Sequence, residues 1–191
     1  AEAVESYRAA LRVFTEADHP LDWAMTMQNM GIALETQGSR TGGAPGSALL
    51  AEAVDSYRAA LRVRTEADYP LDWAMTMQNM GVALKTQGTR TQGALGPALL
   101  AEAVESYRAA LRVFTEADHL FHWAQIQRNI AIAEKALAEH DATKGSQSHL
   151  TAALSHVEAA LTVYDENTGF YLEKAEILRD EIVAALAALD G

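Results

Sequence analysis

Apolar side chains recur every three or four residues along most of the chain, the spacing that forms one apolar stripe on an α-helix. In residues 1–17 the stripe consists of Val4, Tyr7, Leu11 and Phe14. In residues 21–37 it consists of Trp23, Met27, Met30 and Leu34. The pattern predicts one helix over each range, and we call the first kind helix B and the second kind helix A.

Residues 18–20, Asp-His-Pro, predict a break between these helices, because the residue before a proline avoids the α region and proline fits the first turn of a new helix. Gly38 stands where a helix commonly ends on a left-handed residue. Residues 38–47 are rich in Gly, Pro and Ser, a composition typical of turns, so a flexible loop is predicted there. A phosphate-binding loop would need a Lys after the glycines, and this stretch has none.

The segment WAMTMQNMG at residues 23–31 returns unchanged at residues 73–81, and in altered form, WAQIQRNIA, at residues 123–131. Self-similarity at a period of about 50 residues is typical of stacked repeats. We therefore expect one solenoid over residues 1–191, with units at 1–47, 48–97, 98–147 and 148–191.

The later units predict helices of the same two kinds. We expect helix B over 48–67, helix A over 71–87, a third copy of both, a loop over 141–147, and two last helices over 148–166 and 170–189. The predicted fold class is all-α, with about eight helices. The sequence drifts after residue 140, which is typical of a terminal unit that turns a polar face to water.

The net charge and the absence of cysteine exclude several classes of partner and of binding site. The net charge of −11 argues against duplex nucleic acid or an anionic membrane surface as the main partner, because both are bound chiefly through clustered Lys and Arg. Cysteine is absent, so disulfides and thiolate zinc sites are excluded and a cytoplasmic location is favoured. No uncharged apolar run approaches the roughly 20 residues of a spanning helix. We expect no cofactor, no nucleic acid and no membrane partner.

Helix A followed by helix B, with small residues at their closest approach, resembles the tetratricopeptide repeat. In the unit that starts at Trp23, the family pattern is matched by Met27, Met30, Gly31, Leu34, Ala53, Tyr57 and Ala60. The unit is longer than the family's, which has about 34 residues. The stretch HPLDWAMTMQNMGIALETQG is also similar to the kinesin light chain type of this repeat. The resemblance implies a right-handed superhelix of antiparallel helix pairs, whose A helices line a concave groove that binds a protein or peptide without catalysis.

The flank of helix A opposite its apolar stripe is predicted to line that groove. In the three units this flank carries Met25, Gln28, Asn29, Ile32 and Glu35; Met75, Gln78, Asn79, Val82 and Lys85; and Gln125, Arg128, Asn129, Ile132 and Lys135.

Three features of this set bear on the partner. The three Asn amides recur in register, and each can offer a donor and an acceptor to the backbone of an extended peptide. Alternatively, each Asn bonds a neighbouring helix and recurs only because the unit was duplicated. Met25 and Met75 on this flank suit contacts with varied apolar side chains of a partner, although packing inside the protein explains their presence equally well. The cations of the later units indicate an acidic peptide.

Other candidate sites have simpler explanations. His119 and His122 lack a third ligand at a fixed spacing, so no metal site is predicted. No set of Ser, His and Asp stands out, and no enzyme is expected. Trp23, Trp73 and Trp123 are expected to be packing anchors beside the end of the preceding helix B rather than a ligand cage.

The sequence therefore predicts a non-enzymatic scaffold for protein–protein interaction. The alternative is a sensor or oligomerisation segment of a larger multidomain signalling protein, suggested by the match of the first residues to Ala51 onward without a lead-in. The first helix B has no helix A before it, so Tyr7 and Leu11 are expected to have an uncovered side. Self-association through this N-terminal helix would cover it.

Overall fold

A computed structural model of the chain describes residues 2–140 and 145–189. Within these residues the structure is all-α, with eight α-helices, one 3₁₀-helix and no strand. The elements are α1 (Glu2–Ala10), α2 (Pro20–Arg40), α3 (Gly43–Leu61), α4 (Pro70–Arg90), α5 (Leu95–Ala110), α6 (Leu120–His140), α7 (Gly145–Leu161), η1 (Glu166–Thr168) and α8 (Gly169–Leu189). The predicted all-α class and the expected number of helices are confirmed.

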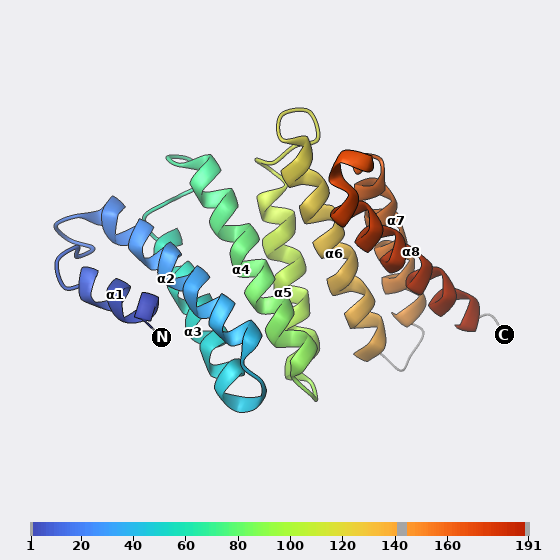
Figure 1. Cartoon of the computed structure of the whole chain (residues 1–191), viewed down its shortest axis with the longest axis horizontal. Coiled ribbons are helices and arrows are strands. Elements are labelled where there is room, and N and C mark those ends of the chain that lie inside the picture. Colours follow the sequence, from blue (N-terminus) through green and yellow to red (C-terminus); the bar gives the residue numbers. More distant parts are fainter. Residues whose placement is uncertain (1, 141–144, 190–191) are drawn as a thin grey trace.

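The helices follow one another in chain order along the long axis of the molecule, and the two termini lie at opposite ends (Figure 1). The most extensive packing joins α2 to α3, α4 to α5 and α6 to α7, and α3, α5 and α7 pack in turn against α4, α6 and α8. Helices α2, α4, α6 and α8 also touch one another in succession. In the described residues the backbones of α3, α5 and α7 do not come as close to one another, although Arg58 of α3 reaches Glu102 of α5, so the even-numbered helices form the closer-packed layer.

Each of the first three B helices ends well before its apolar stripe predicts, and a tight turn follows. In the first unit, Thr15 Oγ1 donates to Asp18 Oδ2 at 2.7 Å and accepts from the Asp18 backbone N–H at 3.1 Å. The same bonds recur in the next two units. Pro20 occupies the first turn of α2, as predicted. The break does not require proline, because α6 starts at the same place with Leu120.

The glycine-rich stretch at residues 38–47 is not the predicted loop. Helix α2 continues past Gly38, which is buried, and α3 begins at Gly43, whose φ is 64°. A Cβ on Gly38 would lie 3.0 Å from the Gly46 carbonyl oxygen, and a Cβ on Gly46 would lie 2.0 Å from the Thr41 carbonyl oxygen. Gly38 and Gly46 are therefore needed for close contact between two helix ends rather than for flexibility.

The last part of the chain also differs from the prediction. Residues 141–144 of the expected loop lie outside the described residues, and residues 145–147 already belong to α7. Helix α7 ends at Leu161, before a turn in which the Asp165 carboxylate accepts from the backbone N–H groups of Asn167 and Thr168. Helix α8 then packs against α7 and touches α6, so it covers the end of the row.

A small residue on each helix A faces a larger one on the following helix B. A Cβ on Gly31 would lie 2.6 Å from Tyr57 Cε1, and a Cβ on Gly81 would lie 2.6 Å from Tyr107 Cε1. Both tyrosine side chains are buried. In the third unit the corresponding, fully buried residues are Ala131 and Val157. The larger residue on helix A is thus matched by a smaller one on helix B, as dense packing requires.

Two of the tryptophans at the start of helix A, Trp23 and Trp73, contact an arginine that follows the later helix B. The guanidinium of Arg62, just after α3, lies 5.2 Å from the centre of the Trp23 ring, and that of Arg112, just after α5, lies 5.0 Å from the Trp73 ring. Such cation–π contacts contribute about 0.5–1 kcal/mol at exposed sites. Trp73 is 9% exposed and belongs to the core, so its ring packs as expected, while the expected contact with the end of the preceding helix B stays a prediction.

The matching of a small residue on helix A with a large one on helix B can be tested by mutation. We expect Gly81→Ala to destabilise the protein by about 1–3 kcal/mol through overpacking against Tyr107, despite the better helix propensity of alanine. Tyr107→Val alone should cost about 3 kcal/mol because it leaves a cavity. The double variant reproduces the Ala131 and Val157 pair, so its loss should fall short of the sum by about 1 kcal/mol or more. Urea denaturation measures all three, and strictly additive losses would contradict the packing argument.

Candidate binding face on the even-numbered helices

The residues predicted to line a groove lie on α2, α4 and α6, and we call the surface that they form the A-face. Its first two units expose large apolar side chains: Met25 is 45% exposed, Ile32 is 40% exposed and Met75 is 40% exposed. The corresponding side chain of Val82 is half-buried and packs against the core. Contiguous exposed apolar groups on a soluble protein commonly mark an interaction site.

The amides on the A-face are used differently from one unit to the next. Asn29 and Asn79 are half-buried, and their side chains make no hydrogen bond within residues 2–140 and 145–189. In the third unit Asn129 Oδ1 accepts from Lys85 Nζ at 3.0 Å. The expectation that each Asn bonds a neighbouring helix therefore describes Asn129 but not the other two. The amides of Asn29 and Asn79 are free to bond a partner.

Gln28 lies inside the array rather than on its surface. It is 6% exposed, and its Oε1 accepts from Arg64 Nη1 at 2.6 Å. Arg64 also lies 3.5 Å from the Asp72 carboxylate, so α2, the end of α3 and α4 are joined by one polar chain. The expectation that Gln28 lines a groove is not met, because Arg64, at the position that Phe14, Phe114 and Tyr164 hold in the other units, bonds it inside the array.

The equivalent junction of the next unit is aromatic. Phe114 is buried and stacks on the His122 ring, with centroids 4.6 Å apart, while the His119 ring meets it edge-on at 5.3 Å. No donor reaches the buried Gln78 Oε1, which has no hydrogen-bond partner among the described residues. The two histidines thus pack against an aromatic ring.

Lys85 and Arg128 bring positive charge to the centre of the A-face. Desolvation lowers the pKa of the Lys85 ammonium to about 8, and the nearby Arg128 charge acts in the same direction, while Glu35 opposes it. The Arg128 Nε is buried without a hydrogen-bond partner in the described part of the chain. No carboxylate of the described residues forms an ion pair with Arg128. This part of the face therefore carries a guanidinium, that of Arg128, without an ion-pair partner among the described residues.

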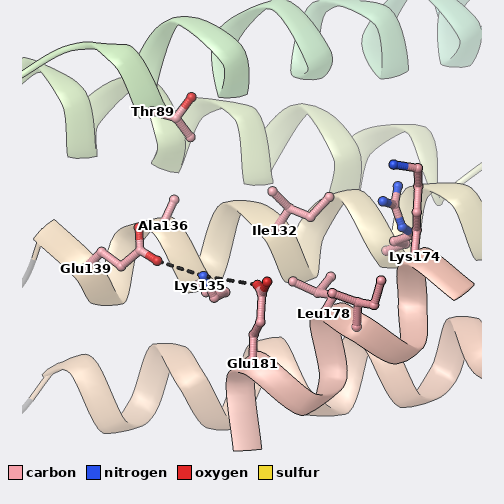
Figure 2. A pocket seen from close by; sticks show the side chains of 10 residues that line it. Thr89, Ile132, Lys135, Ala136, Glu139, Lys174, Leu178 and Glu181 are labelled. Carbon is pink, nitrogen blue, oxygen red and sulfur yellow. Dashed lines mark hydrogen bonds and ion pairs between the residues drawn. The ribbon is translucent and has the colours of Figure 1, made fainter. Parts of the chain in front are cut away.

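A cavity of about 350 Å³ lies between α6 and α8, where the A-face meets the last helix (Figure 2). Lys135, at one side, pairs with Glu139 at 2.8 Å and with Glu181 at 3.5 Å. Lys174 stands apart from that network in Figure 2, and its ammonium lies 4.9 Å from the centre of the Phe170 ring. The remaining lining groups are Thr89, Arg128, Ile132, Ala136, Ile177 and Leu178.

The cavity combines an apolar floor with two cations, Arg128 and Lys174, that form no ion pair among the described residues. This combination suits a side chain that carries a carboxylate next to aliphatic carbon. Of the predicted groove residues, only Arg128, Ile132 and Lys135 reach this cavity. The contributions of α8 were missed, although Lys174 and Glu181 are seven residues apart and so share one side of that helix.

The Lys85 environment predicts a specific pH dependence. The folded protein releases this proton near pH 8, whereas the unfolded chain keeps it up to about pH 10.4, so the unfolded state binds more protons in between. The free energy of unfolding should therefore gain a rising contribution, on the order of 3 kcal/mol, as the pH goes from about 8 to about 10.4.

Urea denaturation of wild type and Lys85→Met across this range isolates the contribution, because other titrating groups are common to both. The difference between the two curves should grow with pH. Lys174→Met, which removes an exposed ammonium, is the matched control. Parallel curves for wild type and Lys85→Met would contradict the assignment.

No helix in the described part of the chain is long and apolar enough to cross a membrane. Among the described residues no three His, Asp or Glu side chains are grouped so as to hold a metal ion. Comparisons with protein-family models, with curated proteins and with solved structures found no match to this chain. The resemblance to the tetratricopeptide repeat accordingly stays a prediction.

Proposed function

We propose that the chain is a right-handed α-solenoid of antiparallel helix pairs, of the tetratricopeptide kind, and that it acts as a non-enzymatic scaffold which binds a peptide or protein segment along the A-face. The proposal joins the repeat pattern of the sequence to the packing of the helices. The units at 1–47, 48–97 and 98–147 each contribute one helix to the A-face.

The packing of the two layers supports a concave A-face. The backbones of α2, α4, α6 and α8 come close to one another, whereas within the described residues those of α3, α5 and α7 stay farther apart, and Arg58 of α3 meets Glu102 of α5 through long side chains. A row of helix pairs that is close-packed on one side and spread on the other must curve towards the close-packed side. The A-face then lies on the inside of the curve, where an extended segment can contact several units at once.

One observation carries the proposal: exposed apolar side chains and amides without a partner lie side by side on the A-face. Met25, Ile32 and Met75 are 40–45% exposed, next to Asn29 and Asn79. Apolar groups give affinity when water is removed, and the amides can satisfy the backbone of the bound segment. A merely solvated face would be expected to carry charged groups at these positions.

The charges give the bound segment a direction. Glu35 lies on α2, and the uncompensated Arg128 lies on α6 beside the cavity that α8 completes. An acidic side chain of the partner fits near Arg128, and apolar side chains fit towards Met25 and Met75. Because the whole chain carries a charge of −11, a segment with one or two acidic groups is favoured over a polyacidic one.

The test is a peptide-array and pull-down screen with wild type, Asn79→Ala and Arg128→Ala. We expect both variants to bind the selected peptides about 5- to 100-fold more weakly, because each removes a contact worth about 1–3 kcal/mol. Arg128→Ala should lose preference for acidic peptides, while Asn79→Ala should weaken binding regardless of peptide charge.

Two exposed residues away from the A-face supply matched controls. Gln92→Ala removes an amide in the turn after α4, and Arg12→Ala removes a guanidinium after α1. Both should bind like wild type. Undiminished binding by Asn79→Ala and by Arg128→Ala would rule out the A-face as the binding surface.

A further inference from the structure

The first two junctions between successive B helices are joined by the same two kinds of ion pair. In the middle of the later helix, Glu52 of α3 meets Arg8 of α1, and Glu102 Oε1 of α5 lies 2.6 Å from Arg58 Nη2 of α3. After the end of each helix, Arg62 reaches back to Glu16 at 2.8 Å and Arg112 to Glu66 at 2.7 Å. The second and third units therefore each turn a Glu and an Arg towards the preceding unit, and the first and second units each turn an Arg and a Glu towards the following unit.

Helices α2 and α4 add a third contact in which a side chain of the later unit reaches back to the preceding unit. Arg90, at the end of α4, reaches back to the end of α2, where its Nη1 donates to the carbonyl oxygens of Gly38 at 2.9 Å and Thr41 at 3.2 Å. Its Nη2 donates to the Ser39 carbonyl oxygen. These carbonyls lie at the C-terminal end of a helix, where intrahelical donors run out, although the Gly38 oxygen also accepts from the Thr41 backbone N–H at 3.2 Å. The guanidinium therefore caps the preceding helix A.

The first unit carries all three of these backward-facing groups, and none of them is used. Glu2, Arg12 and Arg40 occupy the positions of Glu52, Arg62 and Arg90. All three are exposed, and their side chains form no hydrogen bond or ion pair with the described residues.

The apolar surface between these groups is open in the first unit and covered at the equivalent positions of the second and third units. A cavity of about 470 Å³ lies between α1 and α2 and is lined by Ala3, Val4, Ala33 and Arg40, among others. Ala3 is exposed and Ala33 is half-buried. In the later units the corresponding residues are fully buried: Ala53, Ala103, Ala83 and Ala133.

We propose that this N-terminal end, formed by Glu2, Ala3, Ala33, Arg12 and Arg40, is a docking surface for one further helix pair of this same repeat sequence. The occupant supplies an Arg for Glu2, a Glu for Arg12 and the C-terminal carbonyls of a helix A for Arg40. This inference does not depend on what the A-face binds.

The opposite end of a second copy does not meet these requirements. Its last B helix, α7, carries Glu158 at the position that holds Arg8, Arg58 and Arg108 in earlier units, so it would set a carboxylate against Glu2. Helix α8 also packs against α7 and closes that end. The matching chemistry thus belongs to an internal unit rather than to the end of another molecule.

The experiment extends the full chain by one unit, with a copy of residues 51–100 placed directly before Ala1, because residue 100 precedes Ala101 in the same way. We expect one cooperative unfolding transition at a higher urea midpoint than that of the original chain. Arg40→Ala should raise the unfolding equilibrium constant about 5- to 30-fold in the extended chain and less than about 2-fold in the original one.

Arg90→Ala in the original chain is the positive control and should show the same 5- to 30-fold effect, while Glu5→Ala, on the exposed side of α1, should have no effect in either chain. An equal effect of Arg40→Ala in both chains, or a separate transition for the added unit, would overturn the proposal. A concentration-dependent dimer of the original chain that Arg40→Ala dissociates, detected by light scattering, would also overturn it and assign the surface to a second copy.

Discussion

The distance between the two helices of a pair is the constraint on which the rest of the array depends. Gly31 and Gly81 have no side chain, so the rings of Tyr57 and Tyr107 lie directly against the backbone of helix A. The same close approach at the other end of the pair requires Gly38 and Gly46. With both ends fixed, each pair becomes a rigid block, and the positions of the neighbouring pairs follow from its shape.

The regular helices could be predicted from the sequence because apolar spacing and a proline break act locally. The glycine-rich stretch could not, because the same residues serve both in loops and in close helix contacts, and only the neighbouring helix decides between these roles. Gly38 was assigned to a left-handed helix end, yet α2 runs past it. The early ends of the B helices depend on a Thr15 and Asp18 turn that does not interrupt the apolar stripe.

The candidate face was predicted in part, and its errors have one physical origin. Helical periodicity places Met25, Asn29 and Ile32 on one flank, and they are indeed accessible or half-buried there. It also places Gln28 on that flank, but Gln28 is buried because Arg64 comes from a later segment to meet it. The contribution of α8 to the cavity beside Arg128 depends likewise on how the end of the chain packs back. Helical periodicity carries no information about contacts between segments that are far apart in the sequence.

The hydrogen bond between Gln28 and Arg64 also distinguishes the first junction of the array from the second. Nearly identical units invite a chain to fold with one unit skipped, so that the third docks on the first, a known failure of repeat proteins. Such a mispaired junction would bring Phe114 to the place of Arg64 and would leave the Gln28 oxygen buried without a donor, at a cost of about 1–3 kcal/mol. One substitution in a duplicated unit thus distinguishes the first junction from the second, and it favours assembly of the units in the order in which they are encoded.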